Sequence, residues 1–358
     1  SDKVIATAVV EKGTAVVTVP QVNTWSPASP YLYGVEVVLE RDGKVVDRVE
    51  GYTAMRKISV TRDNTPNKYK RMALNNEALF HFGPLDQGWW PDGLYTAPTD
   101  EALEFDIIKT KEMGFNMIRK HIKVEPARWF YHCDRLGMLV WQDMPCGEQK
   151  RPYSWSRHQI NGGSDTELSE EFKRNYYKEW GEIMDFCRFF PSVVVWVPFN
   201  EAWSQFDTEK VVDWTFKRDY SRLINPASGG NLRECGDIMD WHNYPKPCMG
   251  VHHADYVLML GEYGGIGFPV KDHLWNPDMH NWGYGGNRKS MEDVTKTYVK
   301  YAEMLLPFLP QGMSGAIYTQ TTDVEGEVNG FVTYDRKVIK VDVKRICEIN
   351  QKIINALK

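Results

Sequence analysis

The sequence predicts an α/β protein in which a (β/α)8 TIM barrel follows a partial β-sandwich of the immunoglobulin-like type. Two observations lead to this prediction. Residues 1–61 consist of short segments that are rich in β-branched residues and separated by turn signals. In residues 77–358, short apolar runs alternate with longer amphipathic runs, which is typical of strands that alternate with helices.

The N-terminal segment contains five stretches of strand character: KVIATAVV, TAVVTVP, YLYGVEVVLE, KVVDRVEGY and RKISV. Asp42 and Gly43 lie between the third and the fourth stretch, and an Asp-Gly pair at that place predicts a β-hairpin. A complete immunoglobulin-like domain has about 100 residues and seven strands. We therefore expect a partial domain over residues 1–61, and further N-terminal domains in the full-length protein.

Residues 62–76 are polar and without pattern, which predicts a linker. The barrel is expected over residues 77–358. Its predicted strands are 79–84, 116–122, 138–144, 193–199, 226–231, 238–244, 256–262 and 313–320, and its predicted helices are 100–113, 125–136, 167–190, 208–223, 291–306 and 340–356. A doubly wound sheet is the alternative, but no GxGxxG motif opens a helix after the first strand.

Composition excludes several classes of function. The chain has 43 Lys and Arg against 48 Asp and Glu and no basic run, so nucleic acid is not an expected partner. No apolar run approaches the roughly 18 residues of a membrane span. Six cysteines without a CxxC pair do not indicate a zinc site, and no metal or cofactor is expected. No signal peptide is recognisable, and the compartment stays open, with an extracytoplasmic (periplasmic) location compatible with the sequence.

The ends of the predicted strands carry polar side chains. In a TIM barrel the active site lies at the carboxyl ends of the strands. The residues at these ends are Arg119, His121, Asp143, Asn200, Glu201, His242, Tyr244, Glu262 and Tyr318. Glu201 and Glu262 follow strongly apolar strands, where a carboxylate is costly to bury. A salt bridge with a loop cation would explain either one alone, but two that face one pocket form the pair that glycoside hydrolysis requires.

Several segments resemble glycoside hydrolase family 2. FPSVVVWVPFNEAW is similar to its acid/base segment, and VLMLGEYGG is similar to its nucleophile strand. NTWSPASPYLYGVEVVLERDGKVVD resembles the end of its immunoglobulin-like domain, EMGFNMIRKHIKVEPARWFYHCDRLGMLVWQDMP its strand 2 to strand 3 unit, and TDVEGEVNGFVTYDRKVIK the segment after strand 8. Since these segments occur in the family's order over nearly the whole chain, the sequence resembles a β-galactosidase-like fragment of that family.

The resemblance implies roles for five residues. Glu201 would be the general acid and then the general base, and Glu262 would be the nucleophile. Asn200 would bind the sugar 2-hydroxyl, Arg119 would lie beneath the nucleophile and hold it ionised, and Tyr244 would donate a hydrogen bond to it.

The remaining candidates are assigned to substrate binding. His121 and His242 would line the pocket, with a satisfied core histidine as the alternative. Asp143 stands at the pocket edge where the family more often has Glu, and Tyr318 stands where it has the Trp that forms the floor of the sugar site. Trp90 belongs to the aromatic loop FGPLDQGWWPDGLYTAP and could stack on a sugar. The long aromatic, glycine-rich segment 273–290 is interpreted as a wall on the substrate side.

The function expected from the resemblance is that of a retaining exo-β-glycosidase acting on a carbohydrate substrate, with β-galactosides preferred. The stretch VEGEVNG lacks the Asn-x-Lys pattern by which β-glucuronidases hold a sugar carboxylate, which favours a neutral sugar. A β-mannosidase or a β-glucuronidase is the alternative of the same chemistry. A non-catalytic carbohydrate-binding barrel and a metal-dependent hydrolase are alternatives of other classes, opposed by the intact carboxylates and by the lack of a ligand cluster. Homo-oligomerisation is left open.

Overall fold

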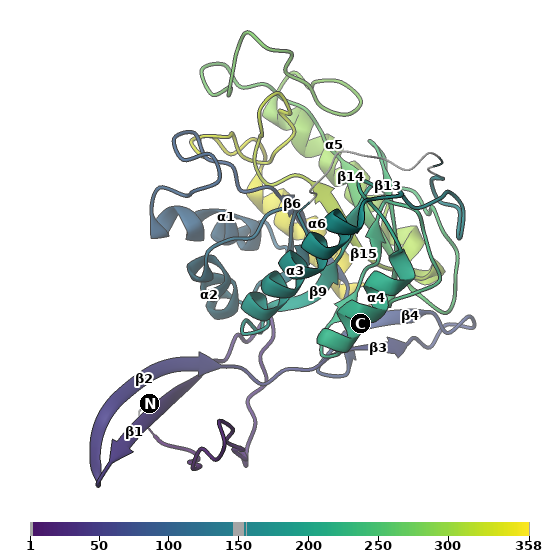
Figure 1. The fold of residues 1–358 in the computed structure, drawn as a ribbon. Coiled ribbons are helices and arrows are strands. Elements are labelled where there is room, and N and C mark those ends of the chain that lie inside the picture. Colours follow the sequence, from purple (N-terminus) through teal and green to yellow (C-terminus); the bar gives the residue numbers. More distant parts are fainter. Residues whose placement is uncertain (1–2, 146–153, 155, 358) are drawn as a thin grey trace.

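A sheet of eight parallel strands forms the centre of the molecule (Figure 1). The computed structural model describes residues 3–145, 154 and 156–357. The strands in chain order are β6 (His81–Asp86), β7 (Met117–Lys120), β8 (Leu139–Asp143), β9 (Val193–Val197), β11 (Leu223–Ile224), β13 (Ile238–Asn243), β14 (Val257–Gly264) and β15 (Met313–Thr319). Their spatial order is β11-β9-β8-β7-β6-β15-β14-β13. Apart from β11 and β13, strands that follow one another among these eight are adjacent in the sheet, and the first strand, β6, lies beside the last, β15, as in a TIM barrel.

The barrel is nearly closed, with a seam between β11 and β13. No ladder joins these two strands in the described residues, but the amide of Asp237 donates to the carbonyl of Ile224 over 2.9 Å. The Asp237 carboxylate in turn accepts from the amide of Ile224 over 2.8 Å. Beyond the seam, the short strands β10 (Phe199–Asn200) and β12 (Ala227–Ser228) pair in parallel. The predicted strand 226–231 is thus a strand only over Ala227–Ser228 and lies outside the eight-stranded sheet. It ends there because the chain turns at Gly229, whose φ of +63° suits a residue without a Cβ.

Within the described residues, six α-helices accompany the eight strands. They are α1 (Asp100–Glu112), α2 (Ala127–Leu136), α3 (Glu170–Cys187), α4 (Thr208–Arg218), α5 (Met291–Glu303) and α6 (Val343–Asn355), and a 3-10 helix, η1, spans Leu306–Gln311. Thr99, Ser169, Ser290 and Asp342 begin four of them by accepting a backbone N–H at the N-cap. Residues 225–256, all of them described, contain no helix, so the alternation of a regular (β/α)8 barrel is interrupted there. None of the helices in the described part of the chain has the length and apolar character needed to cross a membrane.

A three-stranded antiparallel sheet packs against the barrel strands. It consists of β3 (Ile58–Arg62), β4 (Lys70–Leu74) and β5 (Glu77–Ala78), and Ile58 and Met72 share one apolar cluster with barrel residues such as Val257. Arg71 in β4 is buried and donates to the carbonyls of Leu309 and Met313, each over 2.6 Å. The predicted linker 62–76 is thus not a structureless connection. The domain boundaries themselves stay predictions.

The N-terminal region forms one hairpin, β1 (Tyr33–Arg41) and β2 (Lys44–Thr53), which projects from the rest of the molecule (Figure 1). The Asp42-Gly43 turn confirms the predicted hairpin, and both residues have positive φ. Residues 3–19 form no strand beyond a single bridge between Glu11 and Thr14, so the first two predicted strands were wrong. Since a β-strand is stable only beside a partner, β-branched composition alone did not make them strands.

Candidate active site

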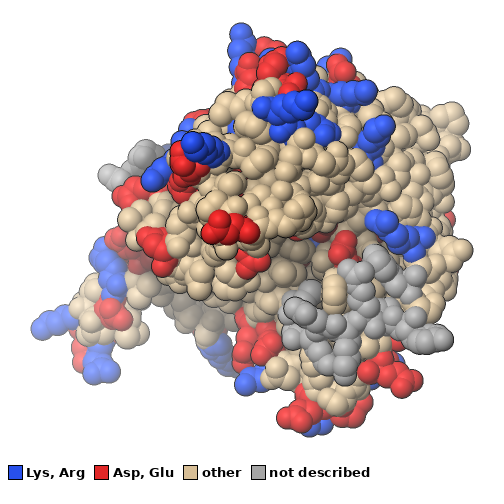
Figure 2. Space-filling model, turned by 90° about the horizontal axis from the view of Figure 1, so that it is seen from above, with Lys and Arg blue, Asp and Glu red and all other residues tan. Residues whose placement is uncertain are grey.

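Three ionisable side chains from different strand ends meet above the barrel. They are Glu201 after β10, His242 in β13 and Glu262 in β14. One carboxylate oxygen of each glutamate and a ring nitrogen of His242 all lie within 4.8 Å of one another. Figure 2, a view from above, shows acidic and basic side chains mixed over the visible face, which offers no broad basic surface for a phosphate backbone.

Arg119 in β7 is fully buried and links three side chains of the site. It donates to Glu262 over 3.1 Å, to both oxygens of Asp143 over 3.1 and 2.9 Å, and to the side-chain oxygen of Asn200 over 2.8 Å. Burial by itself lowers the pKa of Arg119, but Asp143 and Glu262 outweigh it and raise that pKa. The guanidinium therefore remains charged and fixes one oxygen of Glu262.

Asp143 supports this arrangement from β8. Besides Arg119, it accepts from Nδ1 of His121 over 2.9 Å and from the amide of Ile122 over 3.3 Å. Burial would raise the pKa of Asp143, but Arg119 and His121 together hold it below its usual value. Its side chain is 1% exposed, so Asp143 lies behind Arg119 instead of at the predicted pocket edge. His121, with 12% of its side chain exposed, remains closer to solvent.

His242 lies between the two glutamates. Its Nδ1 is 3.1 Å from Oε1 of Glu201 and 3.3 Å from Oε2 of Glu262, and its Nε2 is 2.8 Å from the hydroxyl of Ser228. Ser228 donates its only hydroxyl hydrogen to Asp240 over 2.6 Å, so Nε2 of His242 must donate as well. Burial lowers the pKa of His242, but Glu262, Glu201 and Asp240 outweigh burial and raise that pKa above its ordinary value. The raised pKa favours a ring that carries both protons.

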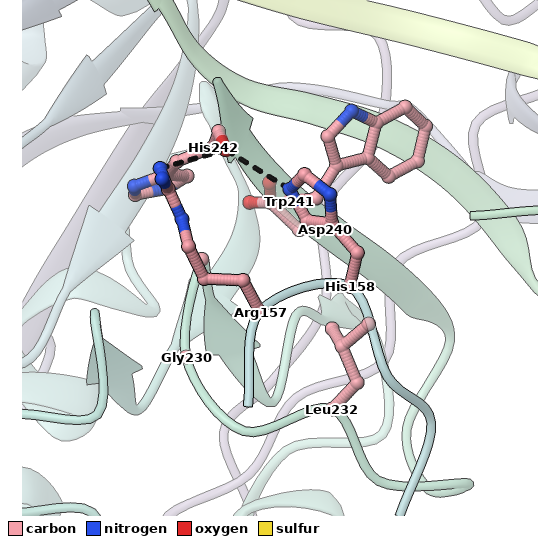
Figure 3. A pocket seen from close by; sticks show the side chains of 8 residues that line it. Arg157, His158, Gly230, Leu232, Asp240, Trp241 and His242 are labelled. Carbon is pink, nitrogen blue, oxygen red and sulfur yellow. Dashed lines mark hydrogen bonds between the residues drawn. The ribbon is translucent and has the colours of Figure 1, made fainter. Parts of the chain in front are cut away.

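A small recess lies beside the backbone of His242, and residues that line it hold that backbone in place (Figure 3). Arg157 and His158 approach the carbonyl oxygen of His242 at 3.3 and 3.1 Å. The lining also includes Gly229, where a Cβ would lie 2.3 Å from the imidazole. A side chain at position 229 would therefore displace the ring that contacts both glutamates.

Tyr244 holds the second oxygen of Glu262. Its hydroxyl donates to Oε2 of Glu262 over 2.6 Å and lies 2.6 Å from the hydroxyl of Thr319 at the end of β15. Its ring stacks on Tyr284, with centroids 3.8 Å apart and planes at 12°. Burial raises the pKa of Tyr244 well above its usual value, and Glu262 raises it further, so the hydroxyl keeps its hydrogen as a donor.

Glu201 differs from Glu262 in its surroundings. Its backbone φ is +49° and that of Ala202 is +62°, so the turn after β10 holds two residues in the left-handed region. The amide of Glu201 donates to the carbonyl of Ser228 over 2.8 Å, which fixes this turn to β12. The side chain of Glu201 is 24% exposed, against 8% for Glu262. Glu201 is thus the glutamate that incoming molecules and water reach more easily.

Two predicted substrate-binding residues lie elsewhere. Tyr318 has no exposed surface, its ring stacks on Phe331 at 4.4 Å, and its hydroxyl accepts from the amide of Ile266 over 3.2 Å. The prediction that Tyr318 forms the floor of a sugar site was therefore wrong. Trp90 is buried, and the guanidinium of Arg336 covers its ring at 3.8 Å, so this ring offers no open face for stacking.

The sequence did not single out Ser228, Asp240, Thr319 or Tyr284. Asp240 carried a signal, because it is a charged residue inside the apolar run of β13. Tyr284 lies in the segment 273–290 that was interpreted as a substrate-side wall. Ser228 and Thr319 are small polar residues that many surface positions share, and no sequence pattern distinguishes them.

Glu201, His242 and Glu262 are also residues of the kinds that bind metal ions in proteins. In this arrangement, however, the two oxygens of Glu262 accept from Arg119 and from Tyr244. A doubly protonated His242 has no lone pair to offer to a metal. The geometry therefore fits acid–base chemistry by the carboxylates better than coordination of an ion.

Comparisons with known proteins agree with this geometry. The model of the family "Glycosyl hydrolases family 2" matches residues 1–56, and that of its TIM barrel domain matches residues 96–249. A β-galactosidase of Psychromonas ingrahamii is 25% identical over 226 residues, which are 62% of this chain and 20% of that protein. The chain thus spans about a fifth of the length of this relative.

Solved structures share the fold. A β-glucuronidase of Parabacteroides merdae superimposes with a TM-score of 0.65 at 15% identity, over 95% of this chain and 44% of the other. A family 2 β-galacturonidase of Eisenbergiella tayi, bound to galacturonate, gives a TM-score of 0.66 at 18% identity, over 94% of this chain and 61% of the other. At these identities the similarity concerns the fold alone.

Proposed function

Since this chain belongs to glycosyl hydrolases family 2, we propose that it provides the catalytic site of a retaining exo-β-glycosidase that acts on terminal β-galactosides. The observation that supports this most is the approach of Glu201 and Glu262 to within 4.8 Å. Retaining glycosidases hold their two carboxyl groups about 5–5.5 Å apart, whereas inverting enzymes leave about 6.5–9.5 Å for a water molecule.

In the first proposed step, a carboxylate oxygen of Glu262 attacks the anomeric carbon of the sugar. The bond between that carbon and the leaving oxygen breaks, and Glu201 gives its proton to the departing oxygen. Arg119 and Tyr244 keep Glu262 oriented, one at each oxygen. The product is a covalent glycosyl-enzyme ester and a free alcohol.

In the second step, Glu201 acts as a base. It takes a proton from a water molecule, whose oxygen attacks the anomeric carbon and releases the carboxylate of Glu262. The greater exposure of Glu201 supports this role, because water must reach it after the first product leaves. Two inversions at one carbon give overall retention.

The preference for a galactoside rests on the relatives named β-galactosidase and on the absence of an Asn-x-Lys sequence in residues 324–330. β-Mannosidase and β-glucuronidase activities are the alternatives with the same chemistry. A panel of 4-nitrophenyl β-glycosides, applied to the complete protein that carries this chain, distinguishes the three.

The nucleophile is tested with Glu262→Ala. This variant should lose turnover of the best aryl β-glycoside of the panel, and external azide should restore part of it by attacking the anomeric carbon directly. The product should be the glycosyl azide of inverted configuration, identified by NMR. Glu182→Ala, on an exposed position of α3, is the control that keeps normal activity. Normal activity in Glu262→Ala would end the assignment.

A further inference from the structure

A polar cluster beside the carboxylate pair plays no part in the chemistry described so far. It consists of Gln87, Gln320, Glu327 and Asn329, which we call the amide–carboxylate cluster. Oε2 of Glu327 accepts from the side-chain amides of Gln320 and Asn329, each over 3.2 Å. Gln320 also donates to the side-chain oxygen of Asn329 over 2.9 Å and accepts from Gln87 over 3.0 Å.

The cluster lies close enough to the carboxylate pair for their charges to interact. Burial raises the pKa of Glu327, Glu262 and Glu201 raise it further, and His121 acts in the opposite direction. Burial also raises the pKa of Tyr284, and Glu327, Glu262 and Glu201 add to this effect. All three carboxylates thus act on the hydroxyl of Tyr284 in the same direction.

Packing connects the same elements. The segment around Glu327 pairs with Trp282 through the hydrogen bond from the Val328 amide to the Trp282 carbonyl, over 2.9 Å. The ring of Trp282 contacts that of Tyr284 at 5.2 Å, and Tyr284 stacks on Tyr244. An unbroken series of contacts therefore leads from Glu327 to the tyrosine that binds Glu262.

The position of Glu327 is well fixed. Lys340, which is fully buried, donates to the carbonyl of Val328 over 3.0 Å and to Asp323 over 2.6 Å. These two hydrogen bonds hold the loop that carries Glu327 against a buried cation. While Oε2 of Glu327 accepts two amide hydrogens, Oε1 accepts none from any described residue. A held carboxylate with one oxygen available is an acceptor for a hydroxyl group of a ligand.

We propose that Glu327 is a specificity-determining residue, which accepts a hydrogen bond from a hydroxyl of a neutral sugar and excludes sugars that carry a carboxylate. This inference rests on the proposed glycosidase function and extends it to the class of sugar. It assigns to Gln320 and Asn329 the role of positioning residues, because they orient the carboxylate of Glu327.

Charge supplies the physical reason. A sugar bound at the carboxylate pair with its own carboxylate toward Glu327 would bring that group near Glu327, Glu201 and Glu262. Like charges brought together without water between them repel strongly. The buried guanidinium of Arg119 already directs its five N–H groups to Asp143, Glu262, Asn200 and the carbonyl of Gly261, so it has no hydrogen left for a ligand. The proteins of similar fold from Parabacteroides merdae and Eisenbergiella tayi are named β-glucuronidase and β-galacturonidase, after acidic sugars. The fold itself therefore does not exclude acidic sugars.

The experiment compares matched pairs of 4-nitrophenyl β-glycosides that differ only at carbon 6, which is a hydroxymethyl group in one and a carboxylate in the other. For the complete protein, kcat/KM is measured on both members of each pair with the wild type, Glu327→Gln and Glu325→Gln. Glu325 lies in the same loop with its side chain exposed, which makes it the matched control.

The wild type should prefer the neutral member. In Glu327→Gln the ratio of the two kcat/KM values should fall by about tenfold or more, because one like charge is removed. Glu325→Gln should keep the wild-type ratio. The ratio does not depend on the fraction of folded protein, so it remains decisive even if Glu327→Gln is less stable.

Two results would overturn the inference and leave the glycosidase chemistry intact: an unchanged ratio in Glu327→Gln, or a wild type that prefers the carboxylated member. A wild type that cleaves neither member of any pair would instead overturn the proposed function, and the inference with it.

Discussion

The Nδ1 atom of His242 lies 3.1 Å from Oε1 of Glu201, in a ring that is only 2% exposed. Because Nε2 of the same ring donates to Ser228, a proton on Nδ1 makes the ring a buried positive charge beside the carboxylate pair. A second carboxylate, Glu262, lies 3.3 Å from the same nitrogen. In its protonated form this ring balances part of the charge of two acids whose oxygens approach within 4.8 Å.

This charge predicts a dependence of stability on pH. The folded-state pKa of His242 is raised above its ordinary value of 6.5, so the folded protein binds the proton more tightly than the unfolded chain. The resulting stability is fully present below pH 6.5 and is lost as the pH rises through the folded-state value. We expect the free energy of unfolding of the wild type to fall from pH 6.5 upward, and His242→Gln to lack this part of the slope.

Urea denaturation between pH 6 and pH 9 measures this difference. His252→Gln, which removes an exposed histidine, should retain the wild-type slope. Parallel slopes in the wild type and in His242→Gln would show that His242 does not bind its proton more tightly in the folded state.

Tyr244→Phe tests the second support of the nucleophile. The substitution removes the donor to Glu262 but keeps the ring that stacks on Tyr284. A hydrogen bond to a charged group contributes about 1.5–3 kcal/mol, so kcat/KM should fall by about 10- to 100-fold with little change in the melting temperature. Tyr220→Phe, at a residue that is 80% exposed, should leave kcat/KM unchanged. An undiminished kcat/KM in Tyr244→Phe would contradict a role in orienting Glu262.

Arg119→Met tests the buried ion network. The variant leaves the carboxylates of Asp143 and Glu262 without their shared cation, and removing one partner of a buried pair costs about 3–5 kcal/mol. The exposed pair of Arg48 and Glu36 gives the control, because Arg48→Met should cost no more than about 1 kcal/mol. Chemical denaturation of both variants compares the two losses, and equal losses would mean that the buried network adds no stability of its own.

Glu201→Gln tests the acid. A general acid contributes about 10²- to 10⁴-fold when the leaving group is poor. The variant should therefore lose far more activity on a methyl β-glycoside than on the 4-nitrophenyl β-glycoside of the same sugar, whose leaving group departs without a proton. The two substrates control for each other within one protein sample, and similar losses on both would argue against Glu201 as the acid.

Much of the barrel could be predicted from the sequence, because its strands and helices have strong periodic patterns and clear caps. The predicted helices overlap the six observed ones, and seven of the eight predicted strands overlap strands of the barrel. The exception is 226–231, where the fifth strand of the sheet is only Leu223–Ile224. A strand of two residues has no periodicity, and its existence depends on Val195 and Trp196 beside it.

The site was predictable to the extent that strand ends reveal it. Glu201 and Glu262 stand out because carboxylates follow long apolar runs, and the structure brings them together. Tyr318 has the same position at a strand end, but its side chain points into the core. Adjacent residues of a strand point to opposite faces, and the pairing of β14 with β15 shifts register between Leu260 and Tyr263, which no sequence pattern reveals. Glu327 reaches the site through the path of a loop, which depends on the buried ion pair of Lys340 with Asp323.

The β1–β2 hairpin has a consequence for the solubility of this chain. In the described residues its two strands pair only with each other, so each strand leaves one edge with unpaired backbone groups. Val37, Leu39, Val46 and Val49 are each more than half exposed. Long apolar edges of this kind are templates for pairing between molecules. Self-association of the isolated chain in concentrated solution should therefore begin at this hairpin. Lysines substituted along its edges should reduce that association, because charged side chains oppose pairing between strand edges.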